Sequence, residues 1–182
     1  INMLGRVVIG EGELDEAPML YIGEELGSGK GQEIDIAVDP VEGTNFVAKN
    51  QPGGIAVLAI SEKNNLLKAP ETYMHKLAIG RNIEKGVVDL DFNLETNLKN
   101  LADAKFKKLS ELTVCLLDRP RHKEIIDTLD KFKVNKKLIS DGDVAGSIFS
   151  ALETSDVDMY LGTGGAPEGV LAASAIKCLG GQ

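Results

Sequence analysis

The sequence predicts a layered α/β protein in two parts, residues 1–110 and residues 111–182. In the second part, a strand-like apolar run is followed by a helix-length segment three times, which is typical of parallel βαβ units. In the first part, short connections such as the EKNNL turn separate the strand-like runs, which favours a mixed or antiparallel sheet. Three of the strands end in glycine-bearing turns that carry acids. Ligands collect at such strand ends in α/β proteins, so we expect a functional site there.

The individual elements follow from β-branched or alternating apolar runs and from the turns between them. In the first part the turn at Asn64–Asn65 tolerates positive φ, so the strands around it are expected to be antiparallel neighbours. The strands expected there are Arg6–Ile9, Glu33–Val38, Gly54–Ile60 and Met74–Ile79, and the helices are Pro18–Leu26 and Asn97–Ala104. In the second part the expected strands are Thr113–Leu117, Lys137–Ile139 and Val157–Leu161, and the helices after them are Glu124–Phe132, Val144–Leu152 and Pro167–Leu179.

Composition limits the functional classes. A length of 182 residues suits one ordinary domain or two small lobes, and 43% hydrophobic with 26% charged residues describes a soluble globular protein. The net charge of -8 argues against a nucleic-acid surface. Two cysteines give no disulfide framework, which favours a reducing cytoplasm. No apolar run approaches membrane-spanning length and no signal segment opens the chain, so no membrane partner is expected.

The run IDIAVDPVEGTNF is the most informative segment of the chain. A strand ends at Asp39, Pro40 stops it and stiffens the corner, and Glu42 adds a second acid. Two carboxylates on a stiff turn suit a hard divalent cation, which prefers oxygen ligands. If the N–H groups near Gly43 and Thr44 open a helix, they also suit an anion beside that cation. The alternative is a plain turn with a solvated acid, since short motifs match by chance.

Two further acidic turns favour the metal hypothesis. GEGELDEAP follows a short apolar strand and brings together Glu11, Glu13, Asp15 and Glu16, and GGAPEG supplies Glu168 after a later strand. Carboxylates that converge without a cation repel one another and raise each other's pKa, so their convergence implies a metal ion.

The second part carries a basic turn that suits a phosphate. Arg119, Pro120 and Arg121 follow the apolar strand TVCLL, and the planar guanidinium pairs bidentately with phosphate. A basic surface turn before a helix is the alternative. Asp141 and Gly142 form another turn before a helix, between the expected strand Lys137–Ile139 and the expected helix Val144–Leu152.

Four other side chains have a structural explanation in isolation. Asp143 is a candidate N-cap, and Tyr73, beside an apolar strand, is a candidate core residue. His75 and His122 are expected to be structural, because the sequence contains no recognisable Ser-His-Asp or Cys-His arrangement. Metal-assisted phosphoryl transfer needs neither.

These motifs together resemble a known family. GEGELDEAPMLYIGE, AVDPVEGT, AP-x-x-YM, RPRH, DGDVA and GGAPEG, in this order and spacing, are similar to class II fructose-1,6-bisphosphatase of the GlpX type. DPVEGT alone marks the wider superfamily of lithium-sensitive, metal-dependent sugar and inositol phosphatases, whereas GEGELDEAP and GGAPEG are more specific. The resemblance implies an α-β-α-β-α sandwich and a cytoplasmic enzyme, expected to be a homo-oligomer, that removes the 1-phosphate of fructose 1,6-bisphosphate.

The resemblance also implies a role for each candidate residue. The metal ligands, for Mn²⁺ or Mg²⁺, are Glu11, Asp39, Glu42 and Glu168, with the Val41 carbonyl as a further candidate. The catalytic pair is Thr44, which orients the attacking water, and Asp15, which supports it. The residues implied to contact substrate are Glu42, Gly43, Thr44, Tyr73, Arg119, Pro120, Arg121, Asp141, Gly142, Asp143 and Gly165. The family has lysine where Arg119 stands, which keeps the charge and alters the geometry.

Several alternatives stay open at the sequence level. The family has a helical segment before GEGE, including one more metal-binding aspartate, and further chain at the other end, so this chain is expected to be a central piece of a longer protein. Sedoheptulose bisphosphate or an inositol phosphate is an alternative substrate, although two arginines argue against a monophosphate. A non-catalytic sugar-phosphate-binding module and a plain scaffold domain are the non-enzyme alternatives.

Overall fold

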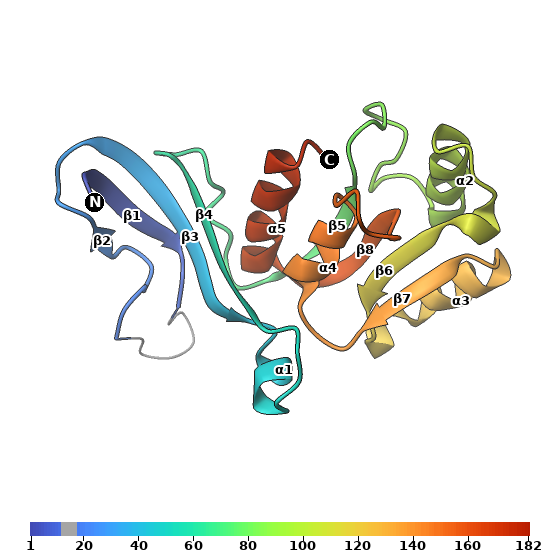
Figure 1. Cartoon of the computed structure of the whole chain (residues 1–182), viewed down its shortest axis with the longest axis horizontal. Helices are drawn as coiled ribbons and strands as arrows, with labels where there is room; N and C mark the ends of the chain where they lie inside the picture. The colour runs from blue at the N-terminus through green and yellow to red at the C-terminus, as the bar shows by residue number, and fades with distance from the viewer. Residues whose placement is uncertain (12–17) are drawn as a thin grey trace.

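The structure, a computed structural model, describes residues 1–11 and 18–182. It has two four-stranded sheets with helices between them and on the far face of the second sheet (Figure 1). The predicted α/β class is therefore confirmed. None of the helices in these residues is long and apolar enough to cross a bilayer.

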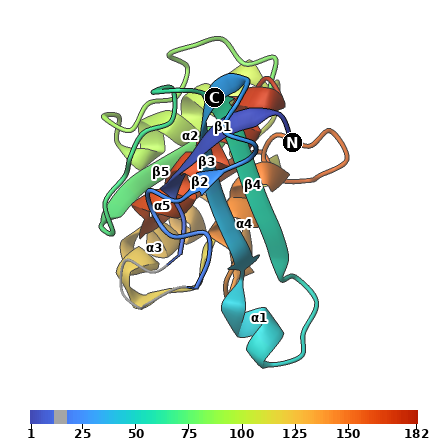
Figure 2. The same cartoon turned by 90° about the vertical axis from the view of Figure 1, so that its left-hand side faces the viewer.

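The first sheet is mixed, as the sequence predicts. Its strand order is β2-β1-β3-β4, where β1 and β3 are parallel and the β1–β2 and β3–β4 pairs are antiparallel. The strands are β1 (Met3–Ile9), β2 (Glu25–Leu26), β3 (Gln32–Glu42) and β4 (Ile55–Glu62). Helix α1 (Thr44–Ala48) projects from the ends of β3 and β4, away from the sheet (Figure 2).

The second sheet contains the predicted βαβ units. Its order is β5-β8-β6-β7, with β6 parallel to both β7 and β8 and with β5 antiparallel to β8. The strands are β5 (Tyr73–Ile79), β6 (Thr113–Leu117), β7 (Asn135–Ile139) and β8 (Met159–Gly165). Helix α3 (Lys123–Lys131) connects β6 to β7, and α4 (Asp143–Phe149) connects β7 to β8.

The helices and sheets alternate in layers. Helices α4 and α5 (Ala166–Cys178) lie between the two sheets, whereas α3 and α2 (Leu94–Ala104) lie on the outer side of the second sheet (Figure 1). Two short 3-10 turns, η1 (Leu109–Glu111) and η2 (Pro120–His122), flank β6. The described residues thus form four layers of the expected five-layer sandwich, in the order sheet, helices, sheet, helices.

Three apolar clusters fill the spaces between these layers. The α2/α3 side of the second sheet buries Leu98, Leu101 and Leu116. Between the sheets, Ala37 packs with α5 residues, and Cys115 packs on the other side of the same helical layer. Side chains of β6 therefore alternate between two cores, which explains why TVCLL is apolar throughout.

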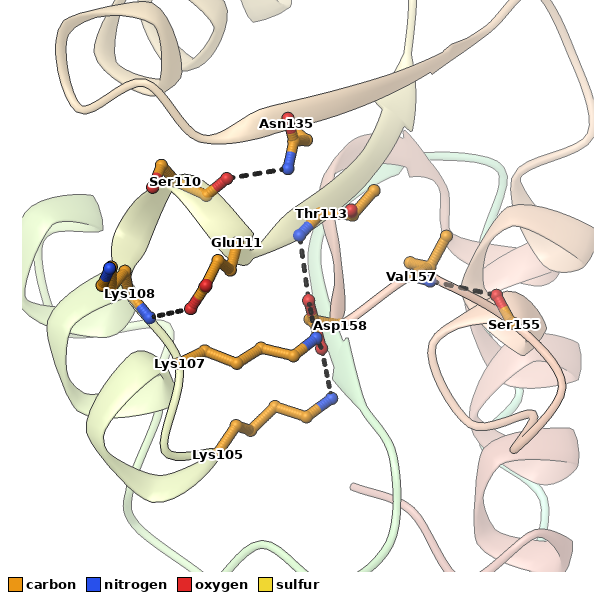
Figure 3. Close-up of polar contacts among 10 residues, drawn as sticks. All are labelled: Lys105, Lys107, Lys108, Ser110, Glu111, Thr113, Asn135, Ser155, Val157 and Asp158. Atoms are coloured by element: carbon orange, nitrogen blue, oxygen red, sulfur yellow. Dashed lines mark hydrogen bonds and ion pairs between the residues drawn. The ribbon is translucent and has the colours of Figure 1, made fainter.

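A buried carboxylate fixes the start of β8 (Figure 3). Asp158, 2% exposed, accepts hydrogen bonds from Lys107 Nζ at 2.7 Å and from the Thr113 N–H at 2.9 Å, and it pairs with Lys105 Nζ at 2.5 Å. Burial opposes ionisation, yet the hydrogen bonds from the two lysines hold the pKa of Asp158 below its usual range. The segment after α2 is thereby attached to the β6 and β8 ends that lie opposite the candidate site.

One predicted helix is wrong. Residues Pro18–Leu26 form bends, turns and the strand β2 instead of a helix. The segment bonds to β1, since the Val7 N–H donates to the Glu24 carbonyl and the Gly23 N–H to the Val7 carbonyl. Leu20 has φ 58 and Gly23 has φ 93, values outside the right-handed helical region. Pairing with β1 therefore overrides the local helical tendency of these residues.

The pairing expected across the EKNNL turn is also wrong. Asn64 does have a left-handed φ of 66, as predicted, but β4 is an edge strand of the first sheet and β5 is an edge strand of the second. The second sheet therefore takes a strand from the first sequence part. The break between sheets lies between β4 and β5, and the domain boundary at residue 110 stays a prediction.

Candidate functional site

The second sheet has a topological switch point at β6. The chain leaves β6 for β7 through α3 on the outer face and returns to β8, on the other side of β6, through α4 on the inner face (Figure 1). Loops that follow β6 and β8 therefore diverge and leave a crevice at the carboxyl ends of the strands, where ligands bind in sheets of this type.

The DPVEGT corner reaches this crevice from the first sheet. Glu42 at the end of β3 accepts a hydrogen bond from the Val144 N–H at 2.9 Å, and the Asn45 N–H donates to Asp141 at 2.9 Å. Asp39 accepts from the Val41 N–H at 2.9 Å, which closes a turn around the Pro40 corner. The corner thus meets the start of α4, about a hundred residues away in the chain.

Glu42 is a buried acid with a strongly perturbed pKa. Its residue is 5% exposed, and burial, together with the charges of Asp143 and Asp39, raises its pKa to about 8, against the lowering effect of the Val144 hydrogen bond. A proton on Glu42 therefore relieves the repulsion at neutral pH. A bound cation would relieve the same repulsion.

Glu168 and Glu11 extend the acidic group. Burial and the Asp143 charge raise the pKa of Glu168, in the first turn of α5. Burial and the charges of Asp39 and Glu71 raise the pKa of Glu11. Glycine at 165 leaves room for the Glu168 carboxylate in its present position, because a Cβ there would lie 1.8 Å from its Oε2.

The donor chemistry suits a divalent cation, although the closed geometry is not formed. Within residues 1–11 and 18–182, no three side chains of the ligating types are gathered closely enough to hold an ion. Glu42 is nevertheless a buried oxygen donor, and Glu42, Glu168 and Glu11 all have raised pKa values, which is what an unneutralised hard-cation site produces. Asp15, Glu13 and Glu16 lie outside the described residues.

A buried lysine that sequence reasoning missed partly neutralises this group. Lys76 of β5 forms an ion pair with Asp143, and both side chains are 7% exposed. Its charge also counteracts part of the rise in the pKa of Glu168. The sequence did indicate a buried lysine, because Lys76 falls on the same inward face of β5 as Met74 and Ala78. An unpaired lysine is very rare at such a position.

The structure also corrects the N-cap explanation of Asp143. Gly142, with φ 78, is the N-cap of α4, and Asp143 is its first helical residue, so its carboxylate pairs with Lys76 instead of capping. Similarly, Gly43, with φ 80, is the N-cap of α1, and Thr44 begins that helix with an exposed side chain.

A basic and aromatic group lies near the acids, where the start of β5 pairs with the end of β8. The Arg121 guanidinium stacks over the Tyr73 ring at 4.9 Å, and its Nε donates to the Thr163 carbonyl at 2.8 Å. Tyr73 is 68% exposed, so the alternative of core packing is wrong for it. Arg119 lies 3.7 Å from the Asp141 carboxylate. We call Arg119, Arg121 and Tyr73 the clamp.

The two histidines lie beside the clamp in different environments. His122 is 1% exposed and contacts backbone through both ring nitrogens. His75 is exposed, with its Nδ1 2.9 Å from Thr163 Oγ1.

Comparison with known proteins decides the family. Residues 1–182 match the family model described as bacterial fructose-1,6-bisphosphatase, glpX-encoded. The chain belongs to this family. It is 51% identical over 182 residues to fructose-1,6-bisphosphatase class 2 of Haemophilus influenzae and 50% identical to fructose-1,6-bisphosphatase 1 class 2 of Escherichia coli strain K12; each match covers 100% of this chain and 54% of the relative.

A third relative has a broader name. D-fructose 1,6-bisphosphatase class 2/sedoheptulose 1,7-bisphosphatase of Synechococcus elongatus is 50% identical over 194 residues, which covers 100% of this chain and 56% of the relative. The chain thus spans about half the length of the curated relatives it matches. The resemblance found in the sequence motifs is confirmed.

Proposed function

We propose that the protein containing this chain is a metal-dependent phosphoric monoester hydrolase that removes the 1-phosphate of fructose 1,6-bisphosphate. The observation that carries this proposal is the placement of acids with raised pKa values, the buried Glu42 and the partly buried Glu168, beside an arginine–tyrosine clamp at the carboxyl ends of β6 and β8. Acids at one end and guanidiniums at the other match a substrate with a reacting phosphate and a remote phosphate.

The acids would hold the metal ion. Asp39, Glu42 and Glu168 would ligate one Mn²⁺ or Mg²⁺, with the Val41 carbonyl as a further donor, and Glu11 would contribute to a second. When bound, such ions polarise the phosphate and lower the pKa of bound water. Because the pKa of Glu42 is raised to about 8, ligation would displace its proton, so affinity for the ion would increase with pH.

The remaining polar residues would position water and substrate. The Thr44 hydroxyl is exposed at the corner and would orient the attacking water, with Asp15 supporting it. The N–H groups after Gly43 and near Gly165 would contact phosphate oxygens. Pro120 keeps the arginines on a stiff turn.

The clamp would bind the remote phosphate. The Nε of Arg121 donates its hydrogen bond to the Thr163 carbonyl. The two terminal nitrogens of the guanidinium would make the bidentate contact with the phosphate. Asp141, Gly142 and Asp143 form the loop into α4 and would face the sugar hydroxyls.

A phosphate-release assay tests the proposal on the intact protein. We expect release from fructose 1,6-bisphosphate but little from fructose 6-phosphate, with activity restored by Mn²⁺ after EDTA treatment. Faster release from inositol monophosphate, or binding of the bisphosphate with no release, would overturn the proposal.

Sedoheptulose 1,7-bisphosphate is the second candidate substrate, because relatives at 50% identity carry both names. The clamp argument applies equally to it, since it also has a phosphate at each end. The ratio of kcat/KM for the two bisphosphates decides between them.

The setting of the enzyme is also a proposal. A cytoplasmic location agrees with the two free cysteines, Cys115 and Cys178, whereas a homo-oligomer that acts in sugar metabolism is proposed from the family alone. Gel filtration with light scattering would measure the number of subunits.

A further inference from the structure

His122 occupies the gap between the two strands that diverge at the switch point. β6 pairs with β8 through Val114–Met159 and Cys115–Tyr160, and the ladder between these two fully described strands goes no further. Past this point, Leu117 of β6 and Thr163 of β8 are joined through the His122 ring. Its Nδ1 lies 2.7 Å from the Leu117 carbonyl, and its Nε2 lies 2.8 Å from the Thr163 nitrogen.

These two partners define the tautomer of the ring. The Leu117 carbonyl can only accept, so Nδ1 carries the proton, and the Thr163 N–H can only donate, so Nε2 is the acceptor. The imidazole is therefore neutral and replaces the missing ladder between β6 and β8. Because the ring is buried and both of its nitrogens are hydrogen-bonded, the imidazole is held in a single orientation.

Thr163 connects this bridge to the clamp. Its N–H binds His122, and its carbonyl accepts the Arg121 Nε at 2.8 Å. The same strand position pairs with His75, two residues from Tyr73 on β5. The position of the Thr163 peptide thus determines where the Arg121 guanidinium lies relative to the Tyr73 ring.

The local sequence leaves room for the ring. A Cβ at Gly162 would lie 3.1 Å from His122 Cε1 and 3.3 Å from Nε2, closer than an ordinary contact. Glycine at this position therefore permits the imidazole to reach the Thr163 N–H.

We propose that His122 is a positioning residue, which aims Arg121 at the remote phosphate of the substrate by holding Thr163 at a fixed distance from the end of β6. This inference rests on the proposed function of the clamp. His122 itself is buried and does not touch the reacting phosphate in this scheme.

The test is a double-mutant cycle between His122 and Arg121 in the intact protein at saturating Mn²⁺. We expect Arg121→Ala and His122→Asn each to raise KM for fructose 1,6-bisphosphate about tenfold, since charge-assisted phosphate contacts are strong and directional. Turnover of p-nitrophenyl phosphate, which has no second phosphate, should change little. In the Arg121→Ala background, His122→Asn should add less than about a twofold further increase, because the two residues act as one unit.

Two further variants separate positioning from general packing. His122→Gln places a carbonyl oxygen near the Nε2 position, whereas Asn can replace only the Nδ1 donor. The increase in KM should therefore be smaller in His122→Gln than in His122→Asn. Gly162→Ala keeps the imidazole but places a methyl group against it. This variant should raise the KM for fructose 1,6-bisphosphate by a smaller factor than His122→Asn. His75→Asn is the matched control, because His75 is exposed and its ring bonds to the hydroxyl of Thr163 instead of the Thr163 backbone, so the KM of this variant should stay unchanged.

Each outcome supports or overturns a distinct statement. An unchanged KM for the bisphosphate in Arg121→Ala would overturn the proposed function of the clamp. A raised KM in Arg121→Ala, combined with an independent effect of His122→Asn or an equal loss on both substrates, would overturn the positioning role alone. If His122→Asn does not fold, an unchanged bisphosphate KM in Gly162→Ala would overturn it as well.

Discussion

The two sides of the candidate site differ in how completely they are built. On the clamp side, Arg121 is held by the Thr163 carbonyl and the Tyr73 ring, so its direction is fixed before any ligand arrives. On the acid side, Glu42 is buried and Glu168 partly buried, both have raised pKa values, and Lys76 offsets part of their charge. The clamp is preorganised, whereas the acid side needs a proton or a cation to be neutral.

The strongest test of this difference removes charge from the acid side. Glu168→Gln and Asp39→Asn should each abolish phosphate release, because a carboxamide keeps the volume but lacks the anionic oxygen that a divalent ion needs. Assays at limiting Mn²⁺, with metal content measured in parallel, check this. Glu153→Gln is the control, since the Glu153 side chain is 70% exposed. Full activity in either variant would remove that residue from the metal site.

Thr44→Ala tests whether the corner between the two sides acts in catalysis. Loss of an orienting hydroxyl should lower kcat by about 10²–10⁴ and leave substrate binding nearly intact. Thr44→Ser keeps the hydroxyl and should retain much of the activity. The structural alternative, in which Thr44 only begins α1, predicts a lower melting temperature with kcat unchanged, so both quantities are measured on both variants.

Lys76→Met should reveal the charge imbalance of the acid side directly. It leaves Asp143 buried without its partner, and removing one member of a buried pair costs about 3–5 kcal/mol of unfolding free energy. Urea unfolding in EDTA checks this value. Lys63→Met is the matched control, because the Lys63–Glu33 pair is solvent-exposed, and its midpoint should not move. Equal effects of the two variants would contradict a special role for Lys76.

The smallest expected effect is the pH dependence of stability without metal. Because the folded state raises the pKa of Glu42 from 4.5 to about 8, it binds more protons than the unfolded state between these values. The contribution of Glu42 to the free energy of unfolding is therefore greatest below about pH 4.5, and it is lost as the pH rises through about 8. Thermal melting from pH 5 to 8 in EDTA should show the decline, and Glu42→Gln should flatten it. A decline of the same slope in Glu42→Gln would assign it to another group.

Local patterns in the sequence were sufficient for several features. The βαβ alternation of the second part depends on apolar runs of strand and helix length, and the acids at the ends of β3 and β8 follow directly from the motifs. The motifs GEGELDEAP and GGAPEG were specific enough to indicate the family, because they combine glycines and acids at fixed spacing.

Tertiary structure alone decided the rest, because the deciding contacts join residues far apart in the chain. Residues Pro18–Leu26 have helical tendency, but hydrogen bonds to β1 fix them as bends and a short strand. The ion pair of Lys76 with Asp143 spans 67 residues, and the bond of His122 to Thr163 spans 41. No local pattern identifies the partner in such a pair, because the two side chains come together only when the second sheet and its helices assemble and exclude water from between them.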